Sequence, residues 1–276
     1  MRLEDGRELH VRRVGPPSDL PVVVVHGFPG SSADWEAVAP LLERDTILFD
    51  LPGYGRSDKS RDASYSLFDQ ANVVEEMLRK LGVTRCSLLA HDMGNTVTAE
   101  LASRHNSGRL GFAIEGIVLT NGSIFIDLAQ LTRGQRLTLR LPNRPSLFSL
   151  PTWVMRRSLM ESFTKEAPPP AGAVDELIAQ TRLGGGERLM PVLIRYIEER
   201  RVHQEHWTAG FVEYDGPLTL VWGELDPIAV LPMTERMKQL RPATRVVTMP
   251  GVGHWPSIEA PALLAEHLRT ALLPTA

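Results

Sequence analysis

The chain has 276 residues, of which 43% are hydrophobic and 23% charged, and this is enough to bury one large core. Its formal net charge of −3 gives no overall field that would attract nucleic acid or an anionic membrane. We therefore expect a small apolar substrate and water as partners, with neither nucleic acid nor membrane, and leave a homodimer open.

The start of the chain shows no targeting signal. Residues 1–20 mix both charge signs without an apolar stretch, and the longest aliphatic run, 22–25, is too short to span a bilayer. The one cysteine, Cys86, lies in an apolar run and cannot form an internal disulfide bond. We therefore predict a cytoplasmic location.

Short apolar runs alternate with helix-like segments over the first 122 residues. The β-branched run at 21–25 ends abruptly in a turn, as a strand buried on both faces of a parallel sheet would. Such alternation indicates a parallel sheet with helices on both faces. The further expected strands are 46–50, 86–92 and 114–122, and the expected helices are 31–43, 67–82 and 93–105.

The alternation stops near residue 123 and resumes at 214. The stretch between them has helical patterns, many arginines and several prolines. We interpret it as an inserted helical cap or lid, 123–213, on a core formed by 1–122 and 214–276. Two strands, 217–223 and 244–251, and two helices, 231–240 and 261–273, complete the expected core.

One part of this lid has an unusual charge pattern. Residues 128–160 carry six arginines and no acidic residue, and their apolar positions recur at helical spacing. We interpret the stretch as a solvated face, with a surface for lipid or for an anionic substrate as the alternative.

The end of the predicted strand 86–92 carries the strongest candidate for catalysis. Asp92 stands between a strand and a helix, and small residues, Ala90 and Gly94, lie two places on either side. A nucleophile elbow has this spacing because its tight turn excludes larger side chains, and Asp92 occupies the place of the serine in G-x-S-x-G. The simpler alternative is that Asp92 caps the following helix.

Two later strand ends favour a catalytic role for Asp92. Asp226 follows the strand 217–223, and His254 follows the strand 244–251. Ligands of open α/β sheets bind at these carboxyl ends, and the chain order nucleophile, acid, histidine is that of a hydrolase triad. Glu224 is a second candidate for the acid.

The turn after the strand 21–25 offers an oxyanion hole. The backbone N–H groups of Phe28 and Met93 are expected to converge on one carboxylate oxygen of Asp92. We interpret His26 mainly as a residue that braces this turn. The predicted substrate pocket comprises His26, Pro29, Trp153, Trp207 and Trp255.

The segments HGFPGSSADW, DLPGYGRSD, AHDMGN, GELDP and GVGHW together resemble the epoxide hydrolase and haloalkane dehalogenase branch of the α/β-hydrolases. LTNGSIF and RYIEERRVHQEHW are further similar to the subgroup of the mesoderm-specific transcript protein. This resemblance implies an α/β-hydrolase fold with a mostly parallel eight-stranded sheet and an inserted lid.

The resemblance also implies roles for the triad. Asp92 attacks an electrophilic sp3 carbon and forms an alkyl ester; His254, oriented by Asp226, then deprotonates the water that attacks this ester. The acid of this family stands at the third residue after the glycine of its loop, which favours Asp226 over Glu224. Asn121 occupies a place where some relatives carry the acid, but an amide cannot do that work.

Tyr196 is the only lid tyrosine, and it precedes Asp226 by 30 residues, a separation like that of the second lid tyrosine in epoxide hydrolases. The resemblance makes it a proton donor for the epoxide oxygen, and plain lid packing is the alternative. The first lid tyrosine is missing, although a lid histidine such as His203 could serve. Met93 and Phe28 stand where haloalkane dehalogenases carry a Trp and an Asn.

We therefore predict a hydrolase that adds water to a small apolar epoxide. A dehalogenase of haloalkanes or haloacids with the same triad is the alternative, and a non-catalytic ligand-binding protein of this fold is a third hypothesis. His203 and His206 lie three apart without a third ligand, so we expect no metal, and we expect no cofactor.

Overall fold

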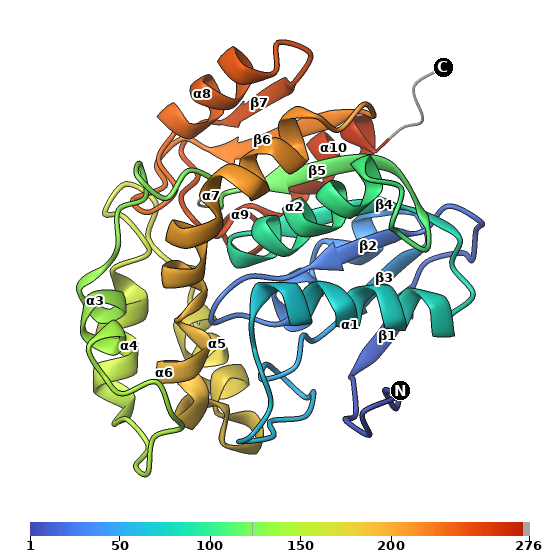
Figure 1. The fold of residues 1–276 in the computed structure, drawn as a ribbon. Coiled ribbons are helices and arrows are strands. Elements are labelled where there is room, and N and C mark those ends of the chain that lie inside the picture. Colours follow the sequence, from blue (N-terminus) through green and yellow to red (C-terminus); the bar gives the residue numbers. More distant parts are fainter. Residues whose placement is uncertain (123, 273–276) are drawn as a thin grey trace.

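The computed structural model describes residues 1–122 and 124–272 and contains a seven-stranded sheet between layers of helices (Figure 1). The strand order is β1-β3-β2-β4-β5-β6-β7, and every neighbouring pair is parallel except β1 and β3. The predicted class, a mostly parallel sheet with flanking helices and an inserted helical region, is confirmed. The strands are β1 (Val11–Val14), β2 (Val22–Val25), β3 (Thr46–Phe49), β4 (Arg85–His91), β5 (Ala113–Thr120), β6 (Leu218–Gly223) and β7 (Arg245–Met249).

The expectation of eight strands is wrong for the part of the chain that the structure describes. The N-terminal residues form only one isolated antiparallel bridge, between Arg2 and Glu8. A tight turn with Gly6 at a φ of 91° lies between these two residues, and it leaves too few residues to extend the pairing into a strand.

Successive residues of the central strands alternate between two buried clusters, one on each face of the sheet. In β2, Val23 and Val25 belong to one cluster and Val22 and Val24 to the other, as the period of a strand requires. The first face is covered by α1 (Leu67–Lys80), α2 (Met93–Asn106) and α8 (Pro232–Leu240), and the second by η1 (Ser32–Trp35), η2 (Ala39–Leu42) and α10 (Pro261–Ala271), with α9 (Pro256–Glu259) just before α10.

The single helix expected at 31–43 is wrong. Two short 3-10 helices stand there instead, η1 and η2. Pro40 has no N–H to donate to a continuous helix, so η2 begins anew at this point. Glu43, at a φ of 53°, ends the segment in a left-handed conformation.

The inserted helical region leaves the sheet after β5 and returns to it before β6. Its first helices lie together at one end of the molecule, and α7 runs back to the core beside α2 (Figure 1). No helix in residues 1–122 and 124–272 is long and apolar enough to cross a membrane. The helices of the region are α3 (Arg133–Leu139), α4 (Thr152–Met160), α5 (Ala173–Arg182), η3 (Leu183–Leu189), α6 (Met190–Leu193) and α7 (Tyr196–Val212).

A buried carboxylate ties α7 to α2. Glu100 on α2 accepts hydrogen bonds from the side chains of Arg104 at 2.9 Å, Trp207 at 3.2 Å and His206 at 2.8 Å. Gly210 allows close approach, since a Cβ at this position would lie 2.5 Å from the Ala99 carbonyl oxygen. The return helix of the lid is therefore fixed to the helix that follows Asp92.

Only one residue, Asp92, separates β4 from α2, so the chain turns sharply there. Gly94 packs against the end of β2, and a Cβ on it would lie 2.2 Å from the carbonyl oxygen of Val25. The new Cβ would be fixed to the backbone of α2, and the Val25 oxygen belongs to the backbone of β2. Neither atom can therefore move aside at little cost.

We predict that Gly94→Ala destabilises the protein by about 1–3 kcal/mol, the usual cost of overpacking a rigid site. Chemical denaturation followed by circular dichroism measures this loss. Gly111→Ala is the matched control, because its new Cβ would meet its nearest neighbour, a Glu75 side-chain oxygen, only at 3.5 Å. Equal stability of the two variants would contradict the tight contact at Gly94.

Candidate active site

Asp92 lies at the turn between β4 and α2 in a backbone conformation that non-glycine residues rarely adopt. Its φ is 48° and its ψ is −115°, and its side chain makes no cap bond to α2, so the simple helix-cap interpretation does not hold. The Phe28 N–H donates to Asp92 Oδ2 at 2.9 Å, and the backbone N–H of Met93 also favours the charged form of the carboxylate. A Cβ on Gly27 would lie 2.5 Å from the Asp92 Cβ, so glycine is needed beside it.

Burial raises the pKa of Asp92, because the charged form is poorly solvated there. The positive charge of His254, the two backbone N–H groups and the positive charge of Arg200 oppose this rise. These neighbours thus offset part of the cost of burying the carboxylate charge.

His254 and Asp226 form a buried pair at the ends of β7 and β6. His254 Nδ1 lies 2.9 Å from Asp226 Oδ2, and Asp226 Oδ1 accepts the backbone N–H groups of Ile228 at 2.7 Å and Ala229 at 2.9 Å. Burial lowers the pKa of His254, but the charges of Asp226 and Asp92 outweigh it and raise the pKa to about 9. Glu224, the other candidate acid, is exposed.

Asn121 holds Asp226 in place, a role that the sequence interpretation missed. Its Nδ2 donates to Asp226 Oδ2 at 2.8 Å and its Oδ1 accepts the Gly223 N–H at 2.8 Å. Its position at the end of β5, beside β6, is the signal that could have suggested this contact.

Tyr196 and Arg200 stand one turn apart on α7 and face the Asp92 side of the site. The Tyr196 ring centre lies 5.5 Å from that of Phe28, and burial together with the charge of Asp92 raises the Tyr196 pKa well above its usual value. The spacing of four residues within RYIEER, which places both side chains on one helix face, could have revealed Arg200.

Arg200 is a buried cation that the sequence interpretation did not single out. It is 3% exposed, and within the described part of the chain it makes neither an ion pair nor a hydrogen bond through its buried Nη1. Burial lowers its pKa to about 10, and the groups that oppose this are Tyr196 and Asp92. The carboxylate among these opposing groups is that of Asp92, the candidate nucleophile.

His26 braces the turn that carries the oxyanion hole. Its Nε2 accepts the Leu51 N–H at 2.9 Å, so its Nδ1 carries the proton and donates to the Gly27 carbonyl oxygen at 2.9 Å. Burial lowers its pKa, which keeps this tautomer neutral.

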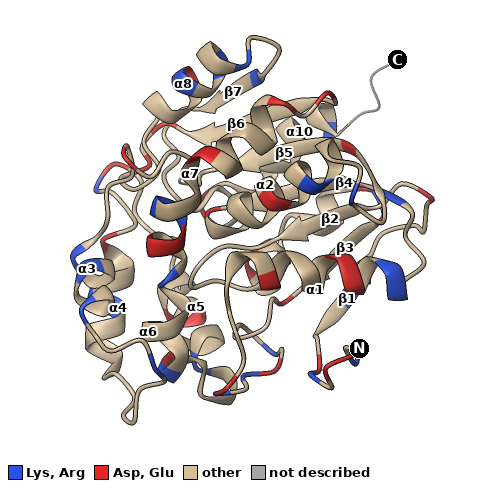
Figure 2. Cartoon of the chain, in the orientation of Figure 1, with Lys and Arg blue, Asp and Glu red and all other residues tan. Residues whose placement is uncertain are grey.

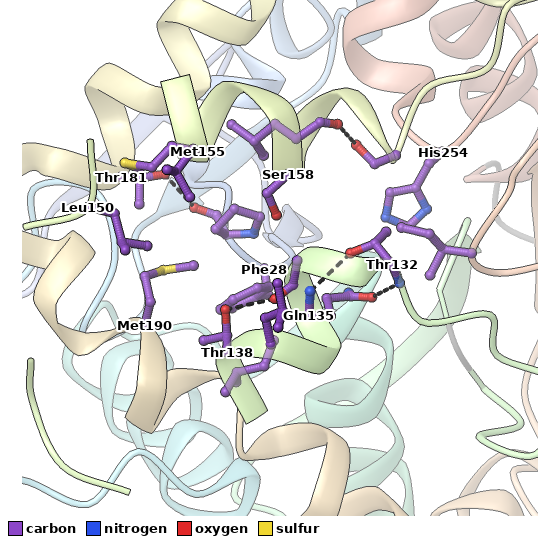
Figure 3. Close-up of a pocket in the computed structure, with 18 of the residues that line it drawn as sticks. Phe28, Thr132, Gln135, Thr138, Leu150, Met155, Ser158, Thr181, Met190 and His254 are labelled. Carbon is purple, nitrogen blue, oxygen red and sulfur yellow. Dashed lines mark hydrogen bonds between the residues drawn. The ribbon is translucent and has the colours of Figure 1, made fainter. Parts of the chain in front are cut away.

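An apolar cavity of about 350 Å³ lies between the lid and the core, and the side chains of Phe28 and His254 border it (Figure 3). Asp92 is not among the lining residues, but Phe28, to which it is hydrogen-bonded, and His254 both are. The cavity is lined by Phe28, Pro29, Thr132, Gly134, Gln135, Leu137, Thr138, Leu141, Leu150, Val154, Met155, Ser158, Leu159, Ser162, Thr181, Met190, Ile194, Ile228, His254 and Trp255.

Three of the five predicted pocket residues do not line this cavity. Pro29 and Trp255 do. Trp153 lies in the first turn of α4 with 69% of its surface exposed, while the following residues face the cavity. Trp207 is buried against Glu100, and His26 is held inside the turn.

The two lid histidines have structural contacts. His206 binds Glu100, and the His203 ring packs edge-on against Phe68 at 5.0 Å. Across residues 1–122 and 124–272, no group of three or more His, Cys, Asp or Glu side chains is placed to hold a metal ion.

Comparison with known proteins decides the family. A model of the alpha/beta hydrolase family matches residues 22–267. The chain belongs to this family. It is 37% identical over 260 residues to "Putative hydrolase LipZ" of Mycobacterium tuberculosis, across 92% of this chain and 88% of LipZ.

The expected likeness to the mesoderm-specific transcript protein is confirmed. This chain is 31% identical to the Bos taurus homologue over 252 residues, across 87% of this chain and 75% of the homologue. A structure described as a "putative ancestral haloalkane dehalogenase AncHLD2" superposes with a TM-score of 0.78 and 19% identity, across 99% of this chain and 97% of that one. At this identity the structural likeness shows the fold alone.

We predict that His254 titrates near pH 9 and that Asp92→Asn and Asp226→Asn each lower its pKa, the second by more. Each substitution removes a negative charge that stabilises the imidazolium, so the neutral ring appears at lower pH. Nitrogen-15 NMR of histidine-labelled protein measures the shift, with His254→Gln to assign the signal.

Asp215→Asn is the control for this titration, since Asp215 has 91% of its side chain exposed and is not among the groups that shift His254. A wild-type His254 that titrates below its ordinary value of 6.5 would mean that burial, not the two carboxylates, governs the ring.

Proposed function

We propose that this hydrolase acts through a covalent ester on Asp92 and adds water to a small apolar epoxide. One observation carries the proposal: a buried carboxylate at a strained strand-helix turn accepts the Phe28 N–H beside a histidine that is paired with a second carboxylate. The printed name of LipZ supports hydrolysis in general terms.

The first half-reaction needs an electrophilic sp3 carbon. Asp92 Oδ1 would attack this carbon and form a C–O bond while the ring C–O bond breaks. Oδ2, which accepts the Phe28 N–H, would become the carbonyl oxygen of the ester. An ester substrate fits this nucleophile poorly, because attack at its carbonyl would give an anhydride instead of an alkyl ester.

The second half-reaction regenerates the carboxylate. His254 takes a proton from water, and the resulting hydroxide adds to the carbonyl carbon of the Asp92 ester. The Phe28 and Met93 N–H groups stabilise the oxyanion on Oδ2. Collapse of this intermediate expels the alkoxide, which takes the proton from His254, and leaves Asp92 as a carboxylic acid. The proton of this acid restores the Tyr196 phenol that protonated the ring oxygen in the first half-reaction, so that epoxide and water together give a diol and Asp92 is again a carboxylate.

The charge of Asp92 couples these two steps. While Asp92 is ionised it helps to raise the His254 pKa to about 9, which favours the imidazolium. Formation of the neutral ester removes this charge, so the His254 pKa falls. The histidine therefore becomes a neutral general base at the stage when a base is required.

Tyr196 supports the epoxide over a halide. Its raised pKa keeps the phenol protonated, and a phenol can donate to the developing alkoxide, which a departing halide does not need. Tyr196 is not among the residues that line the apolar cavity, but its ring packs against that of Phe28, which is. A dehalogenase that uses the same triad is the alternative, since Asp92 attack serves both substrates.

We predict that His254→Gln accumulates the ester on Asp92. The first half-reaction does not need His254, whereas hydrolysis does. Intact-protein mass spectrometry after incubation with an epoxide that the wild type converts should show an increase equal to the mass of that epoxide. The substrate for this experiment is chosen beforehand by measuring which of a panel of epoxides and alkyl halides the wild type converts, with diol formation and halide release as the two readouts.

The double variant Asp92→Asn/His254→Gln is the control and should form no adduct, and Asp92→Asn alone should lose turnover. An adduct on the double variant, in a sample checked to be free of deamidation, would place the nucleophile elsewhere.

We predict that Tyr196→Phe lowers epoxide opening by about 10²- to 10⁴-fold, the range of general acid catalysis. The ring packing against Phe28 is retained, so the thermal midpoint should change little. Stopped-flow measurement of ester formation isolates this step, and any dehalogenation by the same enzyme is the matched comparison, because it should slow much less. An unchanged rate of epoxide opening would assign Tyr196 to packing.

A further inference from the structure

The lid carries a set of large apolar side chains on its outer surface. Phe148 is 80% exposed, Leu147 72%, Trp153 69% and Leu137 60%, although soluble proteins usually bury such groups. We call the set the lid face. Its members belong to α3, α4 and the connection between them: Leu137, Leu141, Leu147, Phe148, Leu150, Trp153 and Met160.

The lid face is surrounded by positive charge. Six arginines lie in residues 128–160 with no acidic residue among them, and Figure 2 shows blue but no red on α3 and α4. Arg156 pairs with Asp175, whereas the other five form no ion pair within the described part of the chain. All six are exposed: Arg133, Arg136, Arg140, Arg144, Arg156 and Arg157.

The apolar cavity reaches this same surface. Leu137, Leu141 and Leu150 line the cavity and are also exposed, by 60%, 42% and 36%. The cavity extends from these side chains to His254. An apolar molecule could therefore pass from the lid face to the candidate active site without crossing water.

The charge pattern separates two occupants of this face. A two-fold dimer would bring the same patch of two copies together and set arginines against arginines. An anionic lipid surface instead offers phosphate groups to the arginines and acyl chains to the leucines and Phe148. The lipid surface therefore accounts for both the arginines and the exposed apolar side chains.

We propose that the lid face docks on an anionic phospholipid bilayer and that the cavity takes its apolar substrate from there. The docking stands on the exposed residues alone, and the uptake of substrate also rests on the proposed function. The arginines supply the attraction to the surface, and the apolar side chains enter its outer layer.

Vesicle flotation tests the docking without any substrate. The whole protein should float with vesicles of phosphatidylcholine and phosphatidylglycerol, and bind at least tenfold more weakly to phosphatidylcholine alone or at 0.5 M salt, as expected for contacts with charged headgroups. Leu147→Ser/Phe148→Ser and Arg140→Gln/Arg144→Gln should each weaken binding at least tenfold. Their positions are exposed, so the fold should persist, as thermal unfolding can verify.

Matched controls lie elsewhere on the surface. Val202→Ser alters an apolar side chain that is 75% exposed on α7, and Arg109→Gln/Arg245→Gln removes two exposed arginines outside the lid. Neither should change binding. Equal loss in these controls, or equal binding to neutral vesicles, would overturn the proposal.

Trp153 supplies a local signal, because the other four tryptophans are buried: Trp35, Trp207, Trp222 and Trp255. Its emission should shift to shorter wavelength on anionic vesicles, and Trp153→Phe should abolish the shift. The proposal would be overturned if the protein did not bind vesicles but formed a concentration-dependent dimer in sedimentation, and if Leu147→Ser/Phe148→Ser dissociated that dimer. The lid face would then be assigned to contact with a second copy of the chain.

Substrate uptake is tested separately. Leu147→Ser/Phe148→Ser should slow turnover of a long-chain epoxide dissolved in anionic vesicles while leaving a water-soluble epoxide unaffected. If the variant turned over the long-chain epoxide in vesicles as fast as the wild type does, the proposed uptake would be overturned. Vesicle binding by Asp92→Asn should match the wild type, so a failure of the covalent mechanism leaves the docking result intact, and a failure of docking leaves the ester on Asp92 intact.

Discussion

The site depends on the one-residue connection between β4 and α2. With a φ of 48°, Asp92 occupies a conformation that costs about 1–3 kcal/mol and persists only where the surroundings impose it. The parallel pairing of β2 with β4 brings the Phe28 N–H to the carboxylate, and Gly27 and Gly94 permit the approach. The same contacts that force the turn therefore also hold the Phe28 N–H against the carboxylate, so stability and site geometry are not separable here.

The charges of the site form one coupled set. Asp92 lies under the influence of His254 on one side and Arg200 on the other, and it influences both in return. A buried cation without a carboxylate partner is unfavourable by itself. The charge of Asp92 opposes the fall of the Arg200 pKa, and the charge of Arg200 opposes the rise of the Asp92 pKa, so a change in either charge shifts the pKa of the other.

The strand ends were predictable and the lid contacts were not. Asp92, Asp226 and His254 follow β-branched or apolar runs whose parallel arrangement dictates a common edge. Lid residues have no such register: Trp153 on α4 and Trp207 on α7 have the same side chain, yet one faces solvent and the other packs on Glu100. The split of the helix expected at 31–43 came from Pro40, a local signal that the apolar spacing concealed.

The net charge of −3 sums charges that do not act together, so it does not describe the charge near the lid. At physiological salt, exposed charges more than about 8 Å apart are largely screened. A surface that approaches the lid therefore meets the arginines of 128–160 and little of the acidic charge elsewhere on the protein. The five arginines of 128–160 that form no ion pair within the described part of the chain therefore bear on the lid face more directly than the overall charge does.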